Sequence, residues 1–514
     1  MPSENTKRIA KNTAFLYMRM LLLMGVAFYT SRVVLNALGV EDYGIYNVVG
    51  GVVAMFSFLT GTFTSATQRF LNYEMGLGNQ QRLHEIFSMS ITLNVIIAVL
   101  IIGISEIVGI WFINHKLVIP PDRLVAAHWV FQFSLLAMAV TIVSTPYNAL
   151  IIAHERMDIF AYISIVEALL KLGIAVVIFF CGGDKLIVYA FLILLVALIV
   201  RLIYSFYCKR KFPECRYKFY WDRKLFCEMG SFAGWNMYGN FAFVVVTQGL
   251  NMLLNMFFGP AVNASRAIAV QVQTAIQGFA TNFMMAVNPQ ITQYYAQRKM
   301  DEMFNLVCFS SKCAFFLLLI LIVPVLLETE MLLKLWLKQV PDYSVIFVRL
   351  ILVQLLLNII LNPLHTSIHA TGKMKFYQLL TGSLTLLNIP VSYLLLCWGM
   401  RPTVVFLVDI VICFLMLFAL LYVLHKEMNF PFLLFMRKVW FVILKVSLVI
   451  GLCAFGVDMV HWSYNYVEVF VKMFLMVCVA FVAVWFLGMT CYERLVIKKY
   501  IVAFVSKFKT VRHL

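Results

Sequence analysis

Charged residues are scarce in this sequence. They make up 13% of its 514 residues, whereas about a quarter is usual in soluble domains. Hydrophobic residues account for 63%, and long apolar runs recur from end to end. This composition excludes a soluble globular protein and indicates a polytopic helical membrane protein. The runs are continuous rather than alternating, and an open sheet edge is not viable in lipid, which excludes strands.

Signals for chemistry are also missing. The sequence has no glycine-rich phosphate loop, no nucleophile–base–acid set and no loop long enough for a catalytic domain, so we predict no catalytic residues, no enzyme activity and no cofactor. The 11 cysteines are scattered without metal-ligand spacing. His365 and His369 are four residues apart but lack a third ligand nearby, so we predict no metal site.

Hydropathy divides the chain into about fourteen predicted spans. Because Met1 to Lys11 is polar and the run after it is too long for a signal core, we expect the first span to be retained. The predicted spans are 12–37, 43–73, 84–113, 125–153, 159–182, 187–208, 225–258, 261–295, 304–326, 343–370, 376–397, 403–425, 437–459 and 466–490.

The basic residues orient these spans. The net charge is +17, and by our assignment about 26 Lys and Arg residues, Lys312 included, lie on one side against about 7 on the other. The asymmetry predicts that both termini are cytoplasmic in a bacterial cytoplasmic (inner) membrane protein. It indicates anionic membrane lipids rather than nucleic acid as the partner of the basic side.

Two halves of the chain show weak similarity. VLNALG at 34–39 matches LLNMFFG at 253–259, and Glu85-Ile86-Phe87 matches Glu302-Met303-Phe304, at offsets of 220 and 217 residues. We infer two parallel six-helix repeats. The predicted organisation is an N-terminal six-helix lobe at 1–208, a basic linker at 209–224, a C-terminal six-helix lobe at 225–425, two additional helices at 426–490 and an amphipathic basic tail at 491–514.

Arginines occur inside the apolar runs, where a charge costs roughly 2.5–3.5 kcal/mol near the midplane. They are Arg19, Arg32, Arg69 and Arg266. One interpretation is that they line a wet pathway for a large anion, since a guanidinium pairs bidentately with phosphate. The alternatives are snorkelling of Arg69 at the cytoplasmic end of its helix and an interfacial position for Arg266 and Arg32.

Amide side chains accompany the arginines on the seventh and eighth spans. The candidates for substrate binding are Asn240, Asn251, Asn255, Gln273 and Gln277. The alternative is that they form interhelical hydrogen bonds.

Acidic residues inside spans are few. Glu167 with Lys171, and Glu468 with Lys472, stand four apart and are expected to neutralise each other. Asp409 has no evident local partner; it is either a coupling site for protons or sodium or a packed structural group.

The segment Leu38-Gly39-Val-Glu-Asp-Tyr-Gly44-Ile-Tyr46 resembles the polysaccharide exporter and O-antigen (Wzx-type) flippase family of the multidrug/oligosaccharidyl-lipid/polysaccharide (MOP) superfamily. The resemblance implies an all-α bundle of two six-helix lobes in a V shape, plus two C-terminal helices. It also implies a lipid-linked oligosaccharide of the undecaprenyl-pyrophosphate type as cargo. The chain is also similar to lipid II flippases of the same superfamily, which have arginines in the first, second and eighth helices. Arg19 or Arg32, Arg69 and Arg266 occupy comparable places in this sequence.

We therefore predict a flippase that moves this cargo across the cytoplasmic membrane by alternating access, for cell-surface polysaccharide synthesis. We expect it to act as a monomer, associated with polysaccharide polymerase machinery. The rival prediction is a cation-coupled multidrug exporter of the same superfamily, whose cavity should be acidic.

Overall fold

The computed structural model describes residues 4–54, 57–115, 119–180, 182–337, 340–459, 466–490 and 493–494. In these ranges every regular element is a helix, and 11 helices are long and apolar enough to span a membrane. The chain forms two compact units: an N-terminal unit of Lys11–Asn240, and a C-terminal unit of Phe241–Leu514 together with Met1–Ala10. The predicted domain limits at 208 and 425 and the V shape stay predictions, and most of the predicted tail lies outside the described residues.

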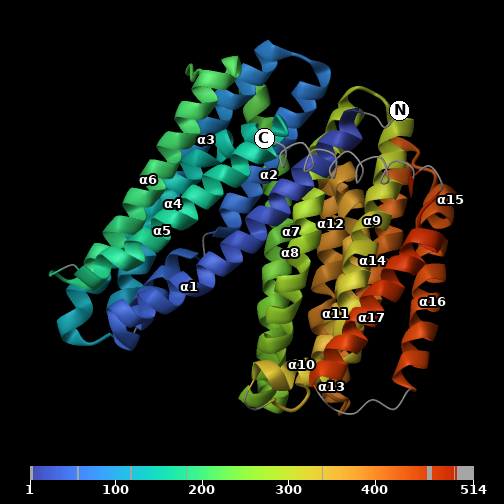
Figure 1. Ribbon diagram of the computed structural model, residues 1–514. Coiled ribbons are helices and arrows are strands. Elements are labelled where there is room, and N and C mark those ends of the chain that lie inside the picture. The colour runs from blue at the N-terminus through green and yellow to red at the C-terminus, as the bar shows by residue number, and fades with distance from the viewer. Residues whose placement is uncertain are drawn as a thin grey trace, which may run out of the picture. The chain divides into compact units, whose positions relative to one another are not determined.

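The N-terminal unit contains six helices and the start of a seventh. They are α1 (Glu4–Ala54), α2 (Ser57–Leu77), α3 (Gln80–His115), α4 (Leu124–Ala153), α5 (Met157–Phe180), α6 (Lys185–Lys211) and α7 (Arg223–Phe258), with short 3-10 turns η1 (Pro121–Arg123) and η2 (Pro213–Cys215). Helices α3, α4, α5 and α6 lie side by side (Figure 1). Phe131 of α4 is fully buried at one end of this packing, against Gly109 of α3.

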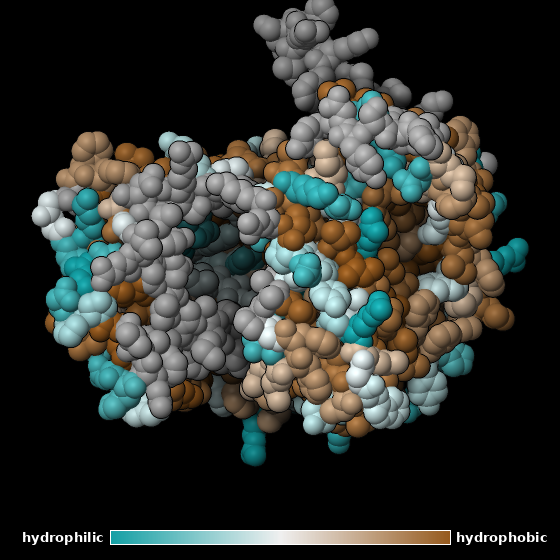
Figure 2. Space-filling view, turned by 90° about the horizontal axis from the view of Figure 1, so that it is seen from below, coloured by the Kyte–Doolittle hydropathy of each residue, from teal (hydrophilic) through white to brown (hydrophobic). Residues whose placement is uncertain are grey.

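The C-terminal unit is built around α11 (Ser344–Thr371), which packs most extensively against α8 (Pro260–Ala296), α9 (Met300–Leu327) and α14 (Val404–Met428). The remaining elements are α10 (Thr329–Trp336), α12 (Met374–Leu386), α13 (Asn388–Cys397), α15 (Phe432–Phe435), η3 (Met436–Trp440), α16 (Phe441–Asp458), α17 (Tyr466–Ala483) and η4 (Val484–Gly488). Figure 2 shows brown, apolar side chains over much of the described surface on one face, as expected of helices that lie in lipid.

Two glycines have the same unusual backbone conformation. Gly39, in the sequence Leu38-Gly39-Val, breaks α1 with φ 82° and ψ 168°, and Gly259 precedes α8 with φ 78° and ψ −176°. This region of backbone space is open almost only to glycine. The two positions are the last residues of the matched segments VLNALG and LLNMFFG, so the sequence similarity coincides with a repeated backbone feature.

Two further pairs of residues with positive φ follow the same offsets. Gly78, after α2, has φ 72° and its counterpart 220 residues on, Arg298 after α8, has φ 56°. Glu155 after α4 has φ 55° and Gly372 after α11, 217 residues on, has φ 76°. The loops that follow corresponding helices therefore turn in the same way in both halves of the chain.

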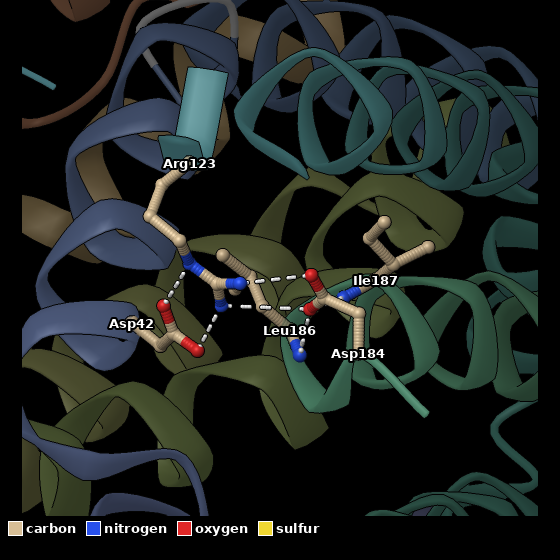
Figure 3. A network of polar contacts seen from close by, with 5 residues as sticks. All are labelled: Asp42, Arg123, Asp184, Leu186 and Ile187. Atoms are coloured by element: carbon tan, nitrogen blue, oxygen red, sulfur yellow. Dashed lines mark hydrogen bonds and ion pairs between the residues drawn. The ribbon is translucent and has the colours of Figure 1, made fainter. Parts of the chain in front are cut away.

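The segment that resembles the exporter family also carries an ion-pair network. Arg123 of η1 donates from Nε to Asp42 at 2.9 Å and from Nη1 to Asp184 at 2.9 Å, and a second nitrogen, Nη2, also contacts Asp42 (Figure 3). Asp184 caps α6 by accepting from the backbone N–H groups of Leu186 and Ile187 at 3.0 and 3.3 Å. One guanidinium thus joins α1, η1 and the start of α6.

Ion pairs attach the last described helices to α9. Lys472 of α17 lies 2.6 Å from Glu328 and 2.8 Å from Asp458, so the predicted pairing with Glu468 is wrong. Lys312 is buried within α9 rather than in a loop, and its Nζ donates to both carboxylate oxygens of Glu493 at 2.9 and 2.8 Å. Tertiary partners outcompete the helical neighbour Glu468 because the end of α9 brings Glu328, and the end of α16 brings Asp458, to Lys472. The pair Glu167–Lys171, by contrast, forms as predicted, at 2.6 Å.

The basic segment 209–224 packs onto the N-terminal unit through Glu214. The Oε1 atom of Glu214 lies 2.5 Å from Nε2 of His154, and its backbone oxygen lies 3.0 Å from Nδ1 of His84. The ring of His154 stacks on Phe212 with centroids 4.0 Å apart. Burial raises the pKa of the Glu214 carboxyl, but the hydrogen bond with His154 and the charges of His154 and His84 outweigh it, so the pKa lies below its usual value.

Candidate functional site

Arg266 is the most deeply buried of the candidate arginines whose side chains are described. It lies on the first turns of α8 with 7% of its surface exposed, and Nη1 donates a hydrogen bond to Oδ1 of Asn251 on α7. Asn251 in turn donates to Gln248 at 3.3 Å. Two of the predicted binding residues are therefore in direct contact, and the amide orients the guanidinium without neutralising its charge.

Asp409 lies close enough to Arg266 for their charges to interact. This carboxylate of α14 accepts a hydrogen bond from Nδ2 of Asn388 on α13, whose Oδ1 accepts from Ser392 at 2.8 Å. The sequence suggested no partner for Asp409 because Asn388 is 21 residues away. The hydrogen bond fits the interpretation of Asp409 as a packed structural group, and its role as a coupling site stays a prediction.

A second polar group lies beside the first in the C-terminal unit. Nε2 of Gln273 on α8 donates to Oε1 of Gln354 on α11 at 3.2 Å, and Gln354 reaches Sγ of Cys413 on α14 at 3.9 Å. Cys413 is one helical turn from Asp409, so amide, thiol and carboxylate groups of three helices come together inside an otherwise apolar bundle.

In the N-terminal unit, aromatic rings surround the other two described arginines. The guanidinium carbon of Arg19 lies 4.4 Å from the ring centroid of Phe160, and its Nε is buried without a hydrogen-bond partner among the described residues. Arg69 lies over Phe70, Tyr73 and Phe232, at 4.5, 5.0 and 5.8 Å. Such cation–π contacts hold a guanidinium in place.

The remaining candidates have different settings. Asn240 donates to Oγ1 of Thr62 at 2.8 Å, which is an interhelical bond between α7 and α2. Asn255 and Gln277 are exposed. The side chain of Arg32 lies outside the described residues.

Sequence reasoning missed several polar groups. Asn388, Ser392, Gln354 and Thr62 complete the contacts above, and their signal was a polar residue within an apolar span. Glu106 of α3 was also overlooked; it accepts a hydrogen bond from Gln132 of α4 at 3.0 Å.

The arrangement is suited to binding rather than to covalent chemistry. In the C-terminal unit it offers the buried guanidinium group of Arg266 with amides and one carboxylate, a set that pairs with phosphate oxygens and hydroxyl groups. In the part of the chain that the structure describes, no three His, Cys, Asp or Glu side chains gather as a metal site. His365 instead lies 2.6 Å from the hydroxyl of Tyr377.

The fold is that of transporters in the MOP superfamily. An outward-facing multidrug resistance MATE family transporter matches with a TM-score of 0.71 at 13% identity, covering 84% of this chain and 99% of its own. A MOP superfamily transporter from Pyrococcus furiosus, described as having a binding pocket of reverse polarity, matches with a TM-score of 0.68 at 14% identity, covering 84% and 98%. These likenesses establish the architecture and confirm the predicted all-α membrane fold.

The family follows from the sequence. A family model described as "Polysaccharide biosynthesis protein" matches residues 9–295, and a MatE model matches residues 237–394. The chain therefore belongs to the polysaccharide biosynthesis protein family and is a multi-pass membrane transporter of the MOP superfamily, as the segment around Gly39 indicated. The "Uncharacterized membrane protein EpsK" of Bacillus subtilis (strain 168) is 20% identical over 301 residues, a match that spans 58% of this chain and 58% of EpsK.

Proposed function

We propose that this transporter is a flippase for a polyprenyl-diphosphate-linked oligosaccharide, which it moves across the cytoplasmic membrane by alternating access. The arginines within the apolar helices, Arg266 buried among them, carry the proposal, because charged side chains inside a membrane are costly and usually mark a substrate pathway. The family supplies the second support, since polysaccharide synthesis requires sugars to cross a membrane. Translocation makes and breaks no covalent bond, in keeping with a transporter rather than an enzyme.

In this proposal the diphosphate is bound by the guanidinium groups of Arg19, Arg32, Arg69 and Arg266. The sugars contact the amides of Asn240, Asn251, Asn255, Gln273 and Gln277, while the prenyl tail stays in lipid. A diphosphate bound at Arg266 competes with Asp409 for the same positive charge. Asp409 would then take up a proton or sodium ion, which couples the ion to the cargo.

The experiment is export of polysaccharide in flippase-deficient cells. Arg19, Arg69 and Arg266 are changed singly to Gln and to Lys. The matched control is Arg349→Gln, because Arg349 is exposed and donates to the backbone oxygen of Leu326 at 3.1 Å. We expect Gln variants to lose at least tenfold in export at unchanged protein level, Lys variants to recover part of it, and the control to export normally. Normal export by all three Gln variants and their combination would refute the assignment.

A second candidate, a cation-coupled multidrug exporter, is supported by the MatE match and by the MATE structures. Its cargo is cationic, so its binding residues should be acidic. Uptake of a cationic dye by inverted vesicles distinguishes the two. Dye transport that depends on Asp409 and survives Arg266→Gln would favour the exporter; the flippase predicts no dye transport.

A further inference from the structure

The segment between α6 and α7 has an exposed surface that the proposed function does not use. Residues 216–224 form a strap, which contains no helix or strand up to Asp222 and then enters the first turn of α7. Basic and aromatic side chains are interleaved along it, in the sequence Arg-Tyr-Lys-Phe-Tyr-Trp-Asp-Arg-Lys. This composition is typical of segments that meet a membrane surface.

The strap runs antiparallel to the start of α3 and is held against it at both ends. The hydroxyl of Tyr217 lies 3.3 Å from Oγ1 of Thr92, and the backbone N–H of the next residue donates to Oγ of Ser88 at 3.4 Å. Towards α7, Asp222 lies 3.7 Å from Nη1 of Arg82. The contacts therefore extend over about ten residues of α3, which is about 15 Å along its axis.

These contacts place the strap at the depth of the membrane interface. Hydropathy predicts that α3 enters the apolar region near residue 84, at the cytoplasmic end of the helix. Thr92 is about eight residues further on, or about 12 Å, so Tyr217 lies beside a part of α3 that is inside the predicted span. The same face of α3 continues with Val95 and Val99, which are 41% and 63% exposed, as expected of a face turned to lipid.

The aromatic rings of the strap are exposed. Tyr217, Phe219 and Trp221 are 48%, 70% and 50% exposed, although the ring of Trp221 also packs against Phe226 with centroids 4.9 Å apart. Clustered rings of this size are unfavourable in water, whereas aromatic side chains are enriched where a protein crosses the membrane interface. Their position next to the exposed apolar face of α3 therefore indicates that they contact lipid.

The basic side chains of this region are also exposed. They are Lys209, Arg210 and Lys211 at the end of α6 and Arg216, Lys218, Arg223 and Lys224 of the strap. Among the residues that the structure describes, none of them forms an ion pair. The acidic residues of the same region are turned inward, because Asp222 contacts Arg82 and Glu214 contacts His154. The exposed positive charge attracts anionic headgroups, by about fivefold in affinity for each basic residue near the surface.

We propose that the strap binds anionic phospholipid headgroups of the cytoplasmic leaflet, with its aromatic rings inserted among the adjoining acyl chains. The proposal is independent of the cargo, because it uses neither the arginines nor the amides of the candidate site. A soluble acidic protein matches the charges but not the rings, which lie beside a part of α3 inside the predicted span. The strap thus anchors the N-terminal unit to one leaflet through both headgroups and chains.

The test places the full-length protein in vesicles of phosphatidylcholine that contain a small fraction of phosphatidylglycerol brominated on its acyl chains. Bromine quenches tryptophan fluorescence at close range, and the contribution of Trp221 is the difference between each protein and the same protein carrying Trp221→Phe. The reference is the same small fraction of brominated phosphatidylcholine. We expect brominated phosphatidylglycerol to quench Trp221 about fivefold more than the reference lipid, because the neighbouring basic residues concentrate it there.

Removal of charge from the strap should abolish this preference. Arg216→Gln combined with Lys218→Gln should bring quenching by the two lipids to within about twofold, and Lys218→Gln alone should give an intermediate ratio. The matched control is Lys299→Gln combined with Arg437→Gln, which removes two exposed basic residues of the C-terminal unit and should leave the ratio unchanged. All four side chains are exposed, so the thermal unfolding midpoints should stay the same and confirm folding.

Two results would overturn the proposal. Equal quenching of Trp221 by both brominated lipids in the wild-type protein would show that the strap does not recognise anionic headgroups. Quenching of Trp221 by aqueous iodide, without quenching by either brominated lipid, would show that the strap faces water and would favour a soluble acidic partner.

Discussion

Replacing Gly39 or Gly259 by alanine tests whether the backbone at these two positions is under conformational constraint. An alanine would have to adopt φ near +80° with ψ near 180°, a region essentially confined to glycine. A residue held there costs about 1–3 kcal/mol. Steric collision adds nothing, because no atom lies within 4 Å of the added Cβ at either position.

The matched controls are Gly25→Ala in α1 and Gly61→Ala in α2. Both sites are helical and also have open space around the Cβ. Alanine in a helix is favoured over glycine by about 0.5–1 kcal/mol, so the controls should be neutral or stabilising. The expected difference between test and control variants is therefore about 1.5–4 kcal/mol.

The assay is the rate of proteolysis of the purified protein at one elevated temperature, together with export in cells. Membrane proteins often unfold irreversibly, so variants are compared by rate at one temperature rather than by an equilibrium constant. We expect Gly39→Ala and Gly259→Ala to be cleaved faster than wild type and both controls to be cleaved no faster. If all four variants behave alike, the backbone argument is wrong, and with it the physical basis for the matched segments.

Three further outcomes are expected. Lys312→Met leaves Glu493 without its buried partner, so it should lower the free energy of unfolding by about 3 kcal/mol, measured as a lower unfolding midpoint. The double variant Lys312→Met with Glu493→Gln should recover much of this loss. If it recovers nothing, the pairing is contradicted. Arg123→Gln should lower the free energy of unfolding by about 1–2 kcal/mol. Arg123→Lys should be destabilised to a similar degree, because only the planar guanidinium reaches the carboxylates of both Asp42 and Asp184. Wild-type stability of Arg123→Lys would argue against this geometry. Because the pKa of Glu214 is lower in the folded protein than its ordinary value of 4.5, the ionised carboxylate stabilises the fold at pH values above 4.5. This stabilisation is lost as the pH falls through the folded-state pKa. Below pH 4.5 the unfolding midpoint of wild type should therefore fall more steeply than that of Glu214→Gln. Parallel unfolding midpoints of the two proteins across pH 3–6 would refute this role of Glu214.

Hydropathy predicted most of the helices, because burial of backbone hydrogen bonds in lipid leaves helices as the main option. The spans predicted at 84–113, 125–153 and 225–258 agree within a few residues with α3, α4 and α7. The predicted division between the spans 12–37 and 43–73 falls at the break of α1 at Gly39. The span 376–397, by contrast, is divided into α12 and α13 at Leu387, an interruption that does not change hydropathy enough to be visible in a window average.

The candidate site was predictable only as a list of residue types. Arg266 and Asn251 stood out as polar groups on neighbouring spans, and the structure brings them into contact. The contact of Asp409 with Asn388 and the pairing of Lys472 with Glu328 were not foreseeable, because they join residues on different helices. Spacing along one helix gives local neighbours, whereas these partners are selected by the packing of whole helices.

The pair Lys312–Glu493 has a consequence for biogenesis. The two residues are 181 positions apart in the chain. At roughly 5–20 residues per second, a ribosome needs about 9–36 s to synthesise the interval. During that time the nascent helix α9 contains a lysine that must be sheltered by water, lipid headgroups or an insertion factor. The contact between α9 and Glu493 can therefore form only after the chain has been synthesised as far as Glu493, and truncation just before Glu493 should yield an inserted but protease-sensitive product.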